Sequence, residues 1–247
     1  AASYGNGVSE ENLGRALNGN SDGLVISTKV GLSNDDLSDV YGAITRSLDA
    51  SLARLRLDHV DIFQLHNTLG RTDFRGTLTI DQIMDAVVPA FDKLRDTGKV
   101  RFLGFTAKGE ADDVHKLVSC GVFHSAQVFY NLLVPSAGEP IAATYPSDDY
   151  KLLLETAKDH GVGAIGVRVL AGGALSGSTA RHPLGMRDVT PIGSETDYAT
   201  DVKRGLAFMP LVKAGHAGSL IELAIRYVIS NPALPTTEIG IATLDEL

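Results

Sequence analysis

The sequence has little cysteine, no long apolar run and no excess of positive charge. Its 247 residues include one cysteine, Cys120. A disulfide within the chain is therefore excluded, which fits a cytoplasmic protein in a reducing compartment. No segment reaches the roughly 18 consecutive apolar residues of a membrane-spanning helix. The formal net charge is −8, which argues against nucleic acid or an anionic membrane as the main partner.

What is present is the composition of an ordinary globular chain, with 44% hydrophobic and 21% charged residues. Short apolar runs alternate with amphipathic segments, and this alternation predicts βαβ units and a parallel sheet. The predicted strands are 24–29, 60–65, 100–105, 125–130, 164–169 and 237–241, and the predicted helices are 37–55, 80–97, 111–119, 148–160, 201–213 and 219–230. Ser9 is the predicted N-cap of an earlier helix, with Glu10 and Glu11 in its first turn.

Two folds are compatible with this alternation. The first is a (β/α)8 TIM barrel, forming a single domain over residues 1–247 that is truncated at both ends. On this interpretation the N-terminal strands lie before residue 1 and a C-terminal segment lies after Leu247. The second is a smaller, open, doubly wound sheet.

Polar residues stand at the ends of two predicted strands. The segment DHVDIFQLHN contains the nearly unbroken apolar stretch 60–65, which is typical of a strand buried on both faces, and it ends on His66 and Asn67. The segment LVISTK ends on Lys29, and Tyr4 begins the glycine-rich turn YGNG. Ligands of α/β folds bind at the carboxyl ends of the strands. We therefore expect Tyr4, Lys29 and His66 to meet at one site.

Several segments together resemble the aldo-keto reductases, in particular the branch of L-galactose and other aldose dehydrogenases. The matching segments, in the order of the family, are AASYGNGVSEENLGRAL, LVISTKVGL, SLDASLARLRLDHVDIFQLHN, GKVRFLGFTA, AQVFYNLL, GVRVLAGGAL and TTEIGIATLDEL. They extend over nearly the whole chain. The resemblance implies a (β/α)8 barrel that binds NAD or NADP without a Rossmann domain.

The resemblance also implies catalytic roles. Tyr4 matches the proton-donating tyrosine of the family, Lys29 the lysine beside it and His66 the histidine, and Asn67 is the expected substrate contact. The family has an aspartate five residues before its tyrosine, a position that falls before residue 1. We expect this aspartate to be the charge partner of the lysine.

General chemistry supports these roles independently of the resemblance. Reduction of a carbonyl by hydride develops negative charge on oxygen, so a nearby acid must supply a proton. A phenol ionises near pH 10, and a neighbouring ammonium favours the phenolate. A neutral histidine donates a hydrogen bond that orients the carbonyl and stabilises the developing oxyanion. Tyrosine, lysine and histidine at one strand-end face therefore suit hydride transfer.

Cofactor contacts are predicted for a further set of residues. Thr106 and Gln127 match residues that hold the nicotinamide carboxamide, and the loop after Arg168 is expected to wrap the pyrophosphate through backbone amides. The complete predicted set is Thr106, Gln127, Val167, Arg168, Leu170, Gly172, Gly173, Leu175, Ile241 and Ala242.

Some of these positions depart from the family pattern. Ala107 stands where an asparagine is usual, and Val167 where a tyrosine stacks on the nicotinamide. Ile241 and Ala242 align with a basic residue and a serine that hold the 2′-phosphate of NADP. These two positions shift the expectation slightly from NADP towards NAD.

Three hypotheses follow for the function. The first is an NAD(P)-dependent oxidoreductase acting on a sugar or on a small aldehyde or ketone. The second is a Schiff-base aldolase that uses Lys29, because lysines at the strand ends of barrels also perform this chemistry. The third is a non-catalytic, cofactor-binding barrel, which the departures at Ala107 and Val167 make worth testing. The seven histidines show no metal-ligand spacing. The sequence identifies neither the substrate nor the oligomeric state.

Overall fold

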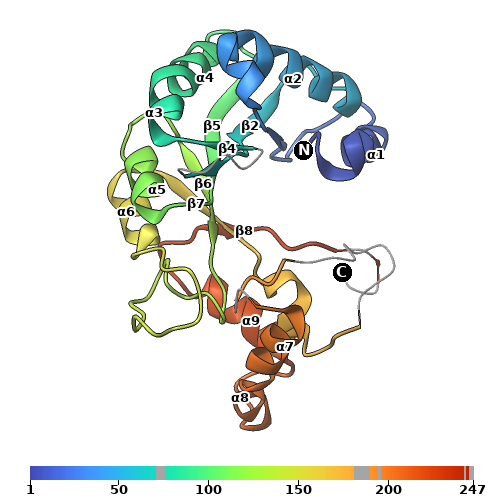
Figure 1. Cartoon of the computed structure of the whole chain (residues 1–247). Coiled ribbons are helices and arrows are strands. Elements are labelled where there is room, and N and C mark those ends of the chain that lie inside the picture. The colour runs from blue at the N-terminus through green and yellow to red at the C-terminus, as the bar shows by residue number, and fades with distance from the viewer. Residues whose placement is uncertain (71–75, 181–189, 194–195, 242, 245–247) are drawn as a thin grey trace. The chain divides into compact units, whose positions relative to one another are not determined.

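The computed structural model describes residues 1–70, 76–180, 190–193, 196–241 and 243–244 (Figure 1). These residues form two compact units. The first unit consists of Ala1–Ala126 and His160–Val162, and the second of Gln127–Asp159 and Gly163–Leu247. Each unit is described by itself below. None of the helices in the described part of the chain has both the length and the apolar character that a membrane crossing requires.

The first unit is built around parallel strands. Its elements are the 3-10 helix η1 (Tyr4–Gly7), α1 (Val8–Leu17), β1 (Ser27–Val30), the 3-10 helix η2 (Asn34–Ser38), α2 (Val40–Leu55), β2 (Val60–Leu65), β3 (Thr68–Leu69), β4 (Thr77–Leu78), α3 (Ile80–Gln82), the π-helix η3 (Ile83–Val87), α4 (Val88–Arg95), β5 (Val100–Ala107) and α5 (Ala111–Val118). Strand β6 (Ser125–Phe129) begins in this unit and continues into the second. β2 pairs in parallel with β1 on one side and β5 on the other, which brings Lys29, Gln64 and Gly104 into one row.

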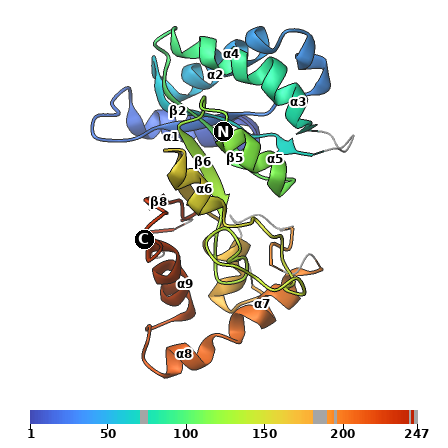
Figure 2. The ribbon, with the colours of Figure 1, turned by 90° about the vertical axis from the view of Figure 1, so that its left-hand side faces the viewer.

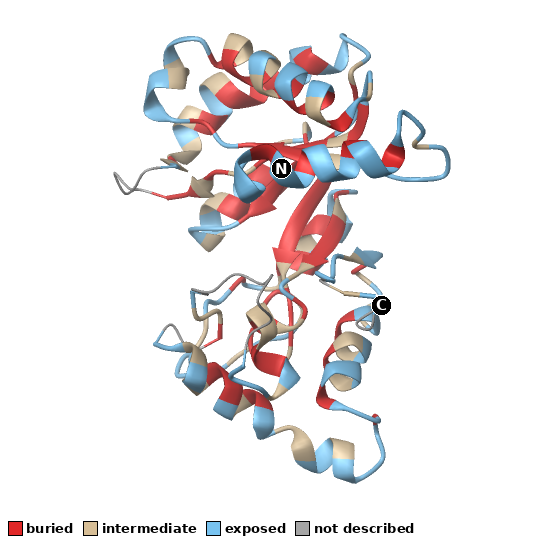
Figure 3. Cartoon of the chain, turned by 90° about the vertical axis from the view of Figure 1, so that its right-hand side faces the viewer, coloured by how far each residue is buried: buried red, intermediate tan, exposed pale blue. Residues whose placement is uncertain are grey.

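Apolar packing of helices against the strands explains why these elements form. The side chains of α2 at Ile44, Leu48 and Leu52 follow the helical period and are buried. Phe63 of β2 stacks on Phe91 of α4, with 5.6 Å between ring centroids. Figure 3 shows strands that are mostly buried and helices with one buried and one exposed face. This is the layering of an α/β fold.

The second unit combines the end of β6 with a helical region and a short strand pair. Its elements are α6 (Leu153–Asp159), β7 (Gly163–Val167), the 3-10 helix η4 (Ala171–Ser176), α7 (Tyr198–Leu206), α8 (Met209–Lys213), α9 (Leu220–Ile229) and β8 (Thr236–Thr237). β7 and β8 pair in parallel. A Cβ atom at Gly166 would lie 2.8 Å from both Leu234 Cδ2 and Thr237 Oγ1, so a larger residue would require these two side chains to shift. Figure 2 shows the helices α7, α8 and α9 following one another along the chain.

Several local predictions are wrong. The strand predicted over 237–241 is the two-residue β8 (Thr236–Thr237), and the strand predicted over 24–29 begins only at Ser27 and ends at Val30. The N-cap of α1 is Gly7, in the left-handed conformation, so Ser9 lies inside the helix. The helix predicted over 148–160 begins only at Leu153, because residues before it bond to a distant turn: the Tyr150 amide donates to Ser136 Oγ. The helix predicted over 201–213 is divided into α7 and α8, because Pro210 lacks the N–H that a continuous helix needs.

Candidate active site

Three predicted catalytic residues of the first unit lie close together. Tyr4 begins η1, Lys29 lies in β1, and His66 directly follows β2, where its amide donates to the Val30 carbonyl at 2.8 Å. Lys29 Nζ donates to the Tyr4 hydroxyl at 3.5 Å. The Tyr4 and His66 rings meet edge to face, with centroids 6.3 Å apart. The structure therefore brings the three side chains together, with Lys29 and His66 at the ends of parallel strands and Tyr4 at the start of η1.

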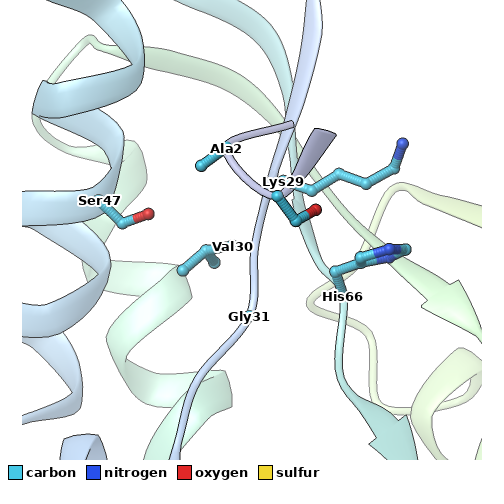
Figure 4. Close-up of a pocket in the computed structure, with 7 residues that line it drawn as sticks. Ala2, Lys29, Val30, Gly31, Ser47 and His66 are labelled. Carbon is cyan, nitrogen blue, oxygen red and sulfur yellow. The ribbon is translucent and has the colours of Figure 1, made fainter. Parts of the chain in front are cut away.

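The surroundings of these residues combine a buried cation with an accessible phenol. Lys29 is 8% exposed and its Nζ lies 5.2 Å from the centroid of the Tyr4 ring, whereas Tyr4 is 45% exposed. Beside them is a hollow of about 200 Å³, whose lining includes Ser3, Lys29, Ser47 and His66. Figure 4 shows the Lys29 and His66 side chains extending to the same side, away from Ser47. A small molecule that reaches the phenol also reaches the imidazole.

Thr106 at the end of β5 is an additional partner of the histidine. Its Oγ1 lies 2.8 Å from His66 Nδ1. The sequence predicted Thr106 as a cofactor contact, and the structure adds this bond to the imidazole. A hydroxyl at Nδ1 helps to hold the plane of the ring, and it serves either tautomer because it can both donate and accept.

Asn67 is buried in the loop that follows His66. Its Nδ2 donates to the carbonyl oxygens of Leu32 and Gly76 at 2.7 and 3.1 Å, and its Oδ1 accepts from the Leu32 amide at 2.9 Å. Its side chain is 2% exposed. This geometry favours a role in holding two loops together over the predicted contact with substrate.

The buried carboxylate of Glu10 bonds to the strand that carries Lys29. Glu10 of α1 is 3% exposed and accepts hydrogen bonds from Thr28, the neighbour of Lys29 in β1, and from Arg54 Nε at 2.8 Å. Burial raises the pKa of the Glu10 carboxyl, but the hydrogen bonds from Thr28 and Arg54 and the charge of Arg54 outweigh it, so the pKa lies below its ordinary value. Glu10 thus ties α1, β1 and α2 together next to Tyr4 and Lys29.

In the second unit, the predicted carboxamide ligand Gln127 is held by a carboxylate. Gln127 is 2% exposed, and its Nε2 lies 2.8 and 2.9 Å from the two carboxylate oxygens of Glu238. Glu238 directly follows β8, and its amide donates to the Gly166 carbonyl of β7 at 2.8 Å. Sequence reasoning missed Glu238, because nothing in the segment TTEIG indicates which residue it faces.

The predicted phosphate loop also lies in the second unit. The backbone is left-handed at Arg168, with φ 60°, and at Ala171, Gly172 and Gly173. Asn131 Nδ2 donates to the Arg168 carbonyl at 3.0 Å and so fixes the start of the loop. The Arg168 side chain is exposed. Of the remaining predicted cofactor residues, Val167 and Leu170 are partly exposed, Leu175 is buried, Ile241 is exposed, and Ala242 lies outside the described residues.

Comparison with known proteins identifies the family of this chain. The model of the aldo/keto reductase family matches residues 1–247. The chain belongs to the aldo/keto reductase family. Its fold is the (β/α)8 barrel of that family of oxidoreductases, which confirms the predicted fold class and the resemblance seen in the sequence.

Individual relatives agree with this assignment. L-galactose dehydrogenase of Arabidopsis thaliana is 27% identical over 254 residues, covering 99% of this chain and 69% of that protein. Among solved structures, the holo form of the aldo-keto reductase AKR11C1 from Bacillus halodurans has a TM-score of 0.67 at 20% identity, covering 99% of this chain and 72% of that one. An aldo/keto reductase from Klebsiella pneumoniae in complex with NADP and acetate has a TM-score of 0.62 at 21% identity, covering 97% and 68%.

The residues of the second unit fit a nicotinamide dinucleotide in part. The buried amide of Gln127, the guanidinium of Arg168 and the left-handed backbone at 171–173 are groups that bind carboxamides and phosphates. Val167 has no aromatic face, and Ala107 of the first unit is fully buried and has no side-chain amide. The polar groups of the second unit therefore suit a dinucleotide in chemical type, whereas Ala107 and Val167 depart from the family pattern.

Proposed function

We propose that this aldo/keto reductase transfers hydride between NAD(P)(H) and the carbonyl group of a sugar or of a small aldehyde or ketone. The observation that carries the proposal is the meeting of Tyr4, Lys29 and His66, with Lys29 Nζ 3.5 Å from the Tyr4 hydroxyl. A phenol beside an ammonium and an imidazole is the acid–base group that carbonyl reduction requires.

Each residue has a definite task in this proposal. A bound nicotinamide supplies or accepts the hydride. In the reducing direction Tyr4 gives its hydroxyl proton to the substrate oxygen, and the Lys29 ammonium favours the phenolate that remains. His66 donates a hydrogen bond from Nε2 to the same oxygen, while Thr106 holds Nδ1 at 2.8 Å. In the oxidising direction Tyr4 acts as the base.

The cofactor side of the proposal rests on the second unit. Gln127 would hold the carboxamide, and Arg168 with the glycine loop would hold the pyrophosphate. The relative from Klebsiella pneumoniae was solved with NADP, which favours NADP(H). Ile241 offers no charge to a 2′-phosphate, which leaves NAD(H) as the second cofactor to test. We propose that residues 1–247 belong to one barrel domain.

The substrate class is proposed from a relative, and the partners and cellular location are proposed from the composition of the chain. L-galactose dehydrogenase, among the relatives, favours an aldose as substrate. The net charge of −8 favours a protein that acts on a small molecule without a nucleic acid or membrane partner. A cytoplasmic location fits its single cysteine. The Schiff-base aldolase hypothesis is not favoured by membership of an oxidoreductase family.

The test is a panel of aldoses, aldehydes and simple alcohols with NAD and NADP separately, in which the absorbance of the reduced cofactor is followed. Tyr4→Phe should lower kcat by about a hundredfold or more, the usual contribution of a general acid. Tyr41→Phe is the matched control, because Tyr41 lies in α2, where its ring stacks under Lys93. Full turnover of Tyr4→Phe would refute the mechanism, and dinucleotide binding without turnover by the unmodified chain would favour the non-catalytic alternative.

A further inference from the structure

The pair of Gln127 and Glu238 places a carboxylate beside the buried amide that we assign to the carboxamide of the cofactor. Both carboxylate oxygens of Glu238 lie within 2.9 Å of Gln127 Nε2. Within the part of the chain that the structure describes, no lysine or arginine forms an ion pair with Glu238. No ion pair within the described residues therefore offsets the negative charge of this carboxylate, which lies next to the amide that we assign to the carboxamide.

Backbone contacts hold this charge in place. The amide of Glu238 donates to the Gly166 carbonyl at 2.8 Å, and the preceding Thr237 donates its hydroxyl to the same oxygen at 2.8 Å. Gly166 lies in β7, where it pairs with Thr237 of β8. The backbone of Glu238 is thus bonded to β7 and its carboxylate to Gln127, which together define the position of the charge.

The charge of a nicotinamide depends on its oxidation state. Hydride transfer to a carbonyl carbon moves two electrons and one hydrogen from the reduced ring, the substrate oxygen takes a proton, and the oxidised ring is left with one positive charge. A fixed carboxylate nearby attracts the oxidised ring and has no net charge to attract in the reduced one. Differential affinity of this kind shifts an equilibrium, whereas equal affinity does not.

We infer that Glu238 is a specificity-determining residue that makes the site prefer the oxidised over the reduced nicotinamide cofactor. This inference rests on the proposed function, because it assigns the carboxamide to Gln127. Its expected size is about fivefold in the ratio of the two dissociation constants, the scale of one partly solvated charge interaction. A fivefold ratio lowers the reduction potential of the bound two-electron couple by about 20 mV. On the protein, the equilibrium then moves towards carbonyl reduction.

The test compares binding of the oxidised and reduced cofactors to the full chain and to two variants. Glu238→Gln removes the charge but retains an amide oxygen that accepts from Gln127. Glu155→Gln removes the same charge from an exposed position of α6 in the same unit. Dissociation constants are measured by calorimetry for NAD⁺, NADH, NADP⁺ and NADPH, and the ratio of the reduced to the oxidised constant is calculated for whichever pair binds.

The expected result is a ratio about fivefold lower in Glu238→Gln than in the unmodified chain, with Glu155→Gln unchanged. An unchanged ratio in Glu238→Gln would overturn the inference, as would an equal weakening of both forms, which would mean that Glu238 only supports Gln127. Neither result affects the proposed function if the unmodified chain binds the cofactor and turns over a carbonyl. Failure of the unmodified chain to bind any of the four dinucleotides would overturn both.

Discussion

Replacement of Glu10 by glutamine tests the packing behind the active site. Glu10 is 3% exposed, its Oε2 lies 2.7 Å from Arg54 Nη2, and it also accepts from Thr28. At that distance an ion pair is worth about 6 kcal/mol at an effective dielectric constant near 20. Desolvation of both groups offsets most of this gain, and truncation of a fully buried pair costs about 3 to 5 kcal/mol.

Two features of this pair reduce the expected cost. The Arg54 side chain is 25% exposed, so water solvates part of its charge in the variant. The glutamine oxygen still accepts one hydrogen bond. We therefore expect Glu10→Gln to lower the free energy of unfolding by about 2 kcal/mol at pH 7. Glu11→Gln at the neighbouring, exposed position of α1 should change it by less than about 0.5 kcal/mol.

The pH dependence of this difference has a defined sign. The pKa of Glu10 in the folded chain lies below its ordinary value of 4.5. A depressed carboxyl pKa stabilises the fold above the unfolded value, and this stabilisation is lost as the pH falls through the folded value. Urea unfolding followed by circular dichroism should give the full difference at pH 7 and a shrinking one below about pH 4.5. A difference that is equal at both pH values, or a Glu10→Gln variant as stable as Glu11→Gln, would refute the reasoning.

Further predictions concern the site and the packing of α1. Thr106→Val removes the hydroxyl 2.8 Å from His66 Nδ1 and should lower kcat about tenfold with little change in KM. Thr106→Ser should restore kcat. A pH profile of kcat that is the same in both variants and in the unmodified chain would count against a positioning role for Thr106. Gly14→Ala should cost about 3 kcal/mol in urea unfolding, because its Cβ would lie 2.8 Å from the backbone of Leu55, and a stable variant would contradict this packing. Borohydride added with a ketose should leave the intact mass unchanged, and a covalent adduct on Lys29 would revive the aldolase hypothesis.

Elements with a continuous buried face could be predicted from the sequence. The apolar run 60–65 matches β2 at both ends, and the prediction of 37–55 contains the whole of α2. In both cases burial imposes an apolar pattern that no partner elsewhere in the chain overrides. The adjacency of Tyr4, Lys29 and His66 was predictable for a related reason. Parallel strands deliver their last residues to one face, whatever the register.

The partners of buried polar groups could not be predicted in this way. Gln127 and Glu238 are 111 positions apart, and Glu10 and Arg54 are 44 positions apart. A strand period gives the face of a residue but not which residue of another strand or helix it meets. Both carboxylates stood in segments that read as ordinary, an acidic first helical turn and a strand end. In the folded chain, Glu10 is buried and bonds to Arg54, and the carboxylate of Glu238 accepts from Gln127.

The charges of the two units, taken with the proposed reaction, favour the same direction of chemistry. Carbonyl reduction leaves negative charge on the substrate side and positive charge on the nicotinamide. The Lys29 ammonium lies 3.5 Å from the proton donor Tyr4 and would stabilise the negative charge. The Glu238 carboxylate accepts from Gln127 and would stabilise the positive charge on the nicotinamide. The two effects are separable, because Lys29 acts on the proton donor and so on kcat, whereas Glu238 acts on the affinity for the cofactor. A double variant Lys29→Met and Glu238→Gln should therefore lose both in additive free energies, which kcat and the dissociation constants measure separately.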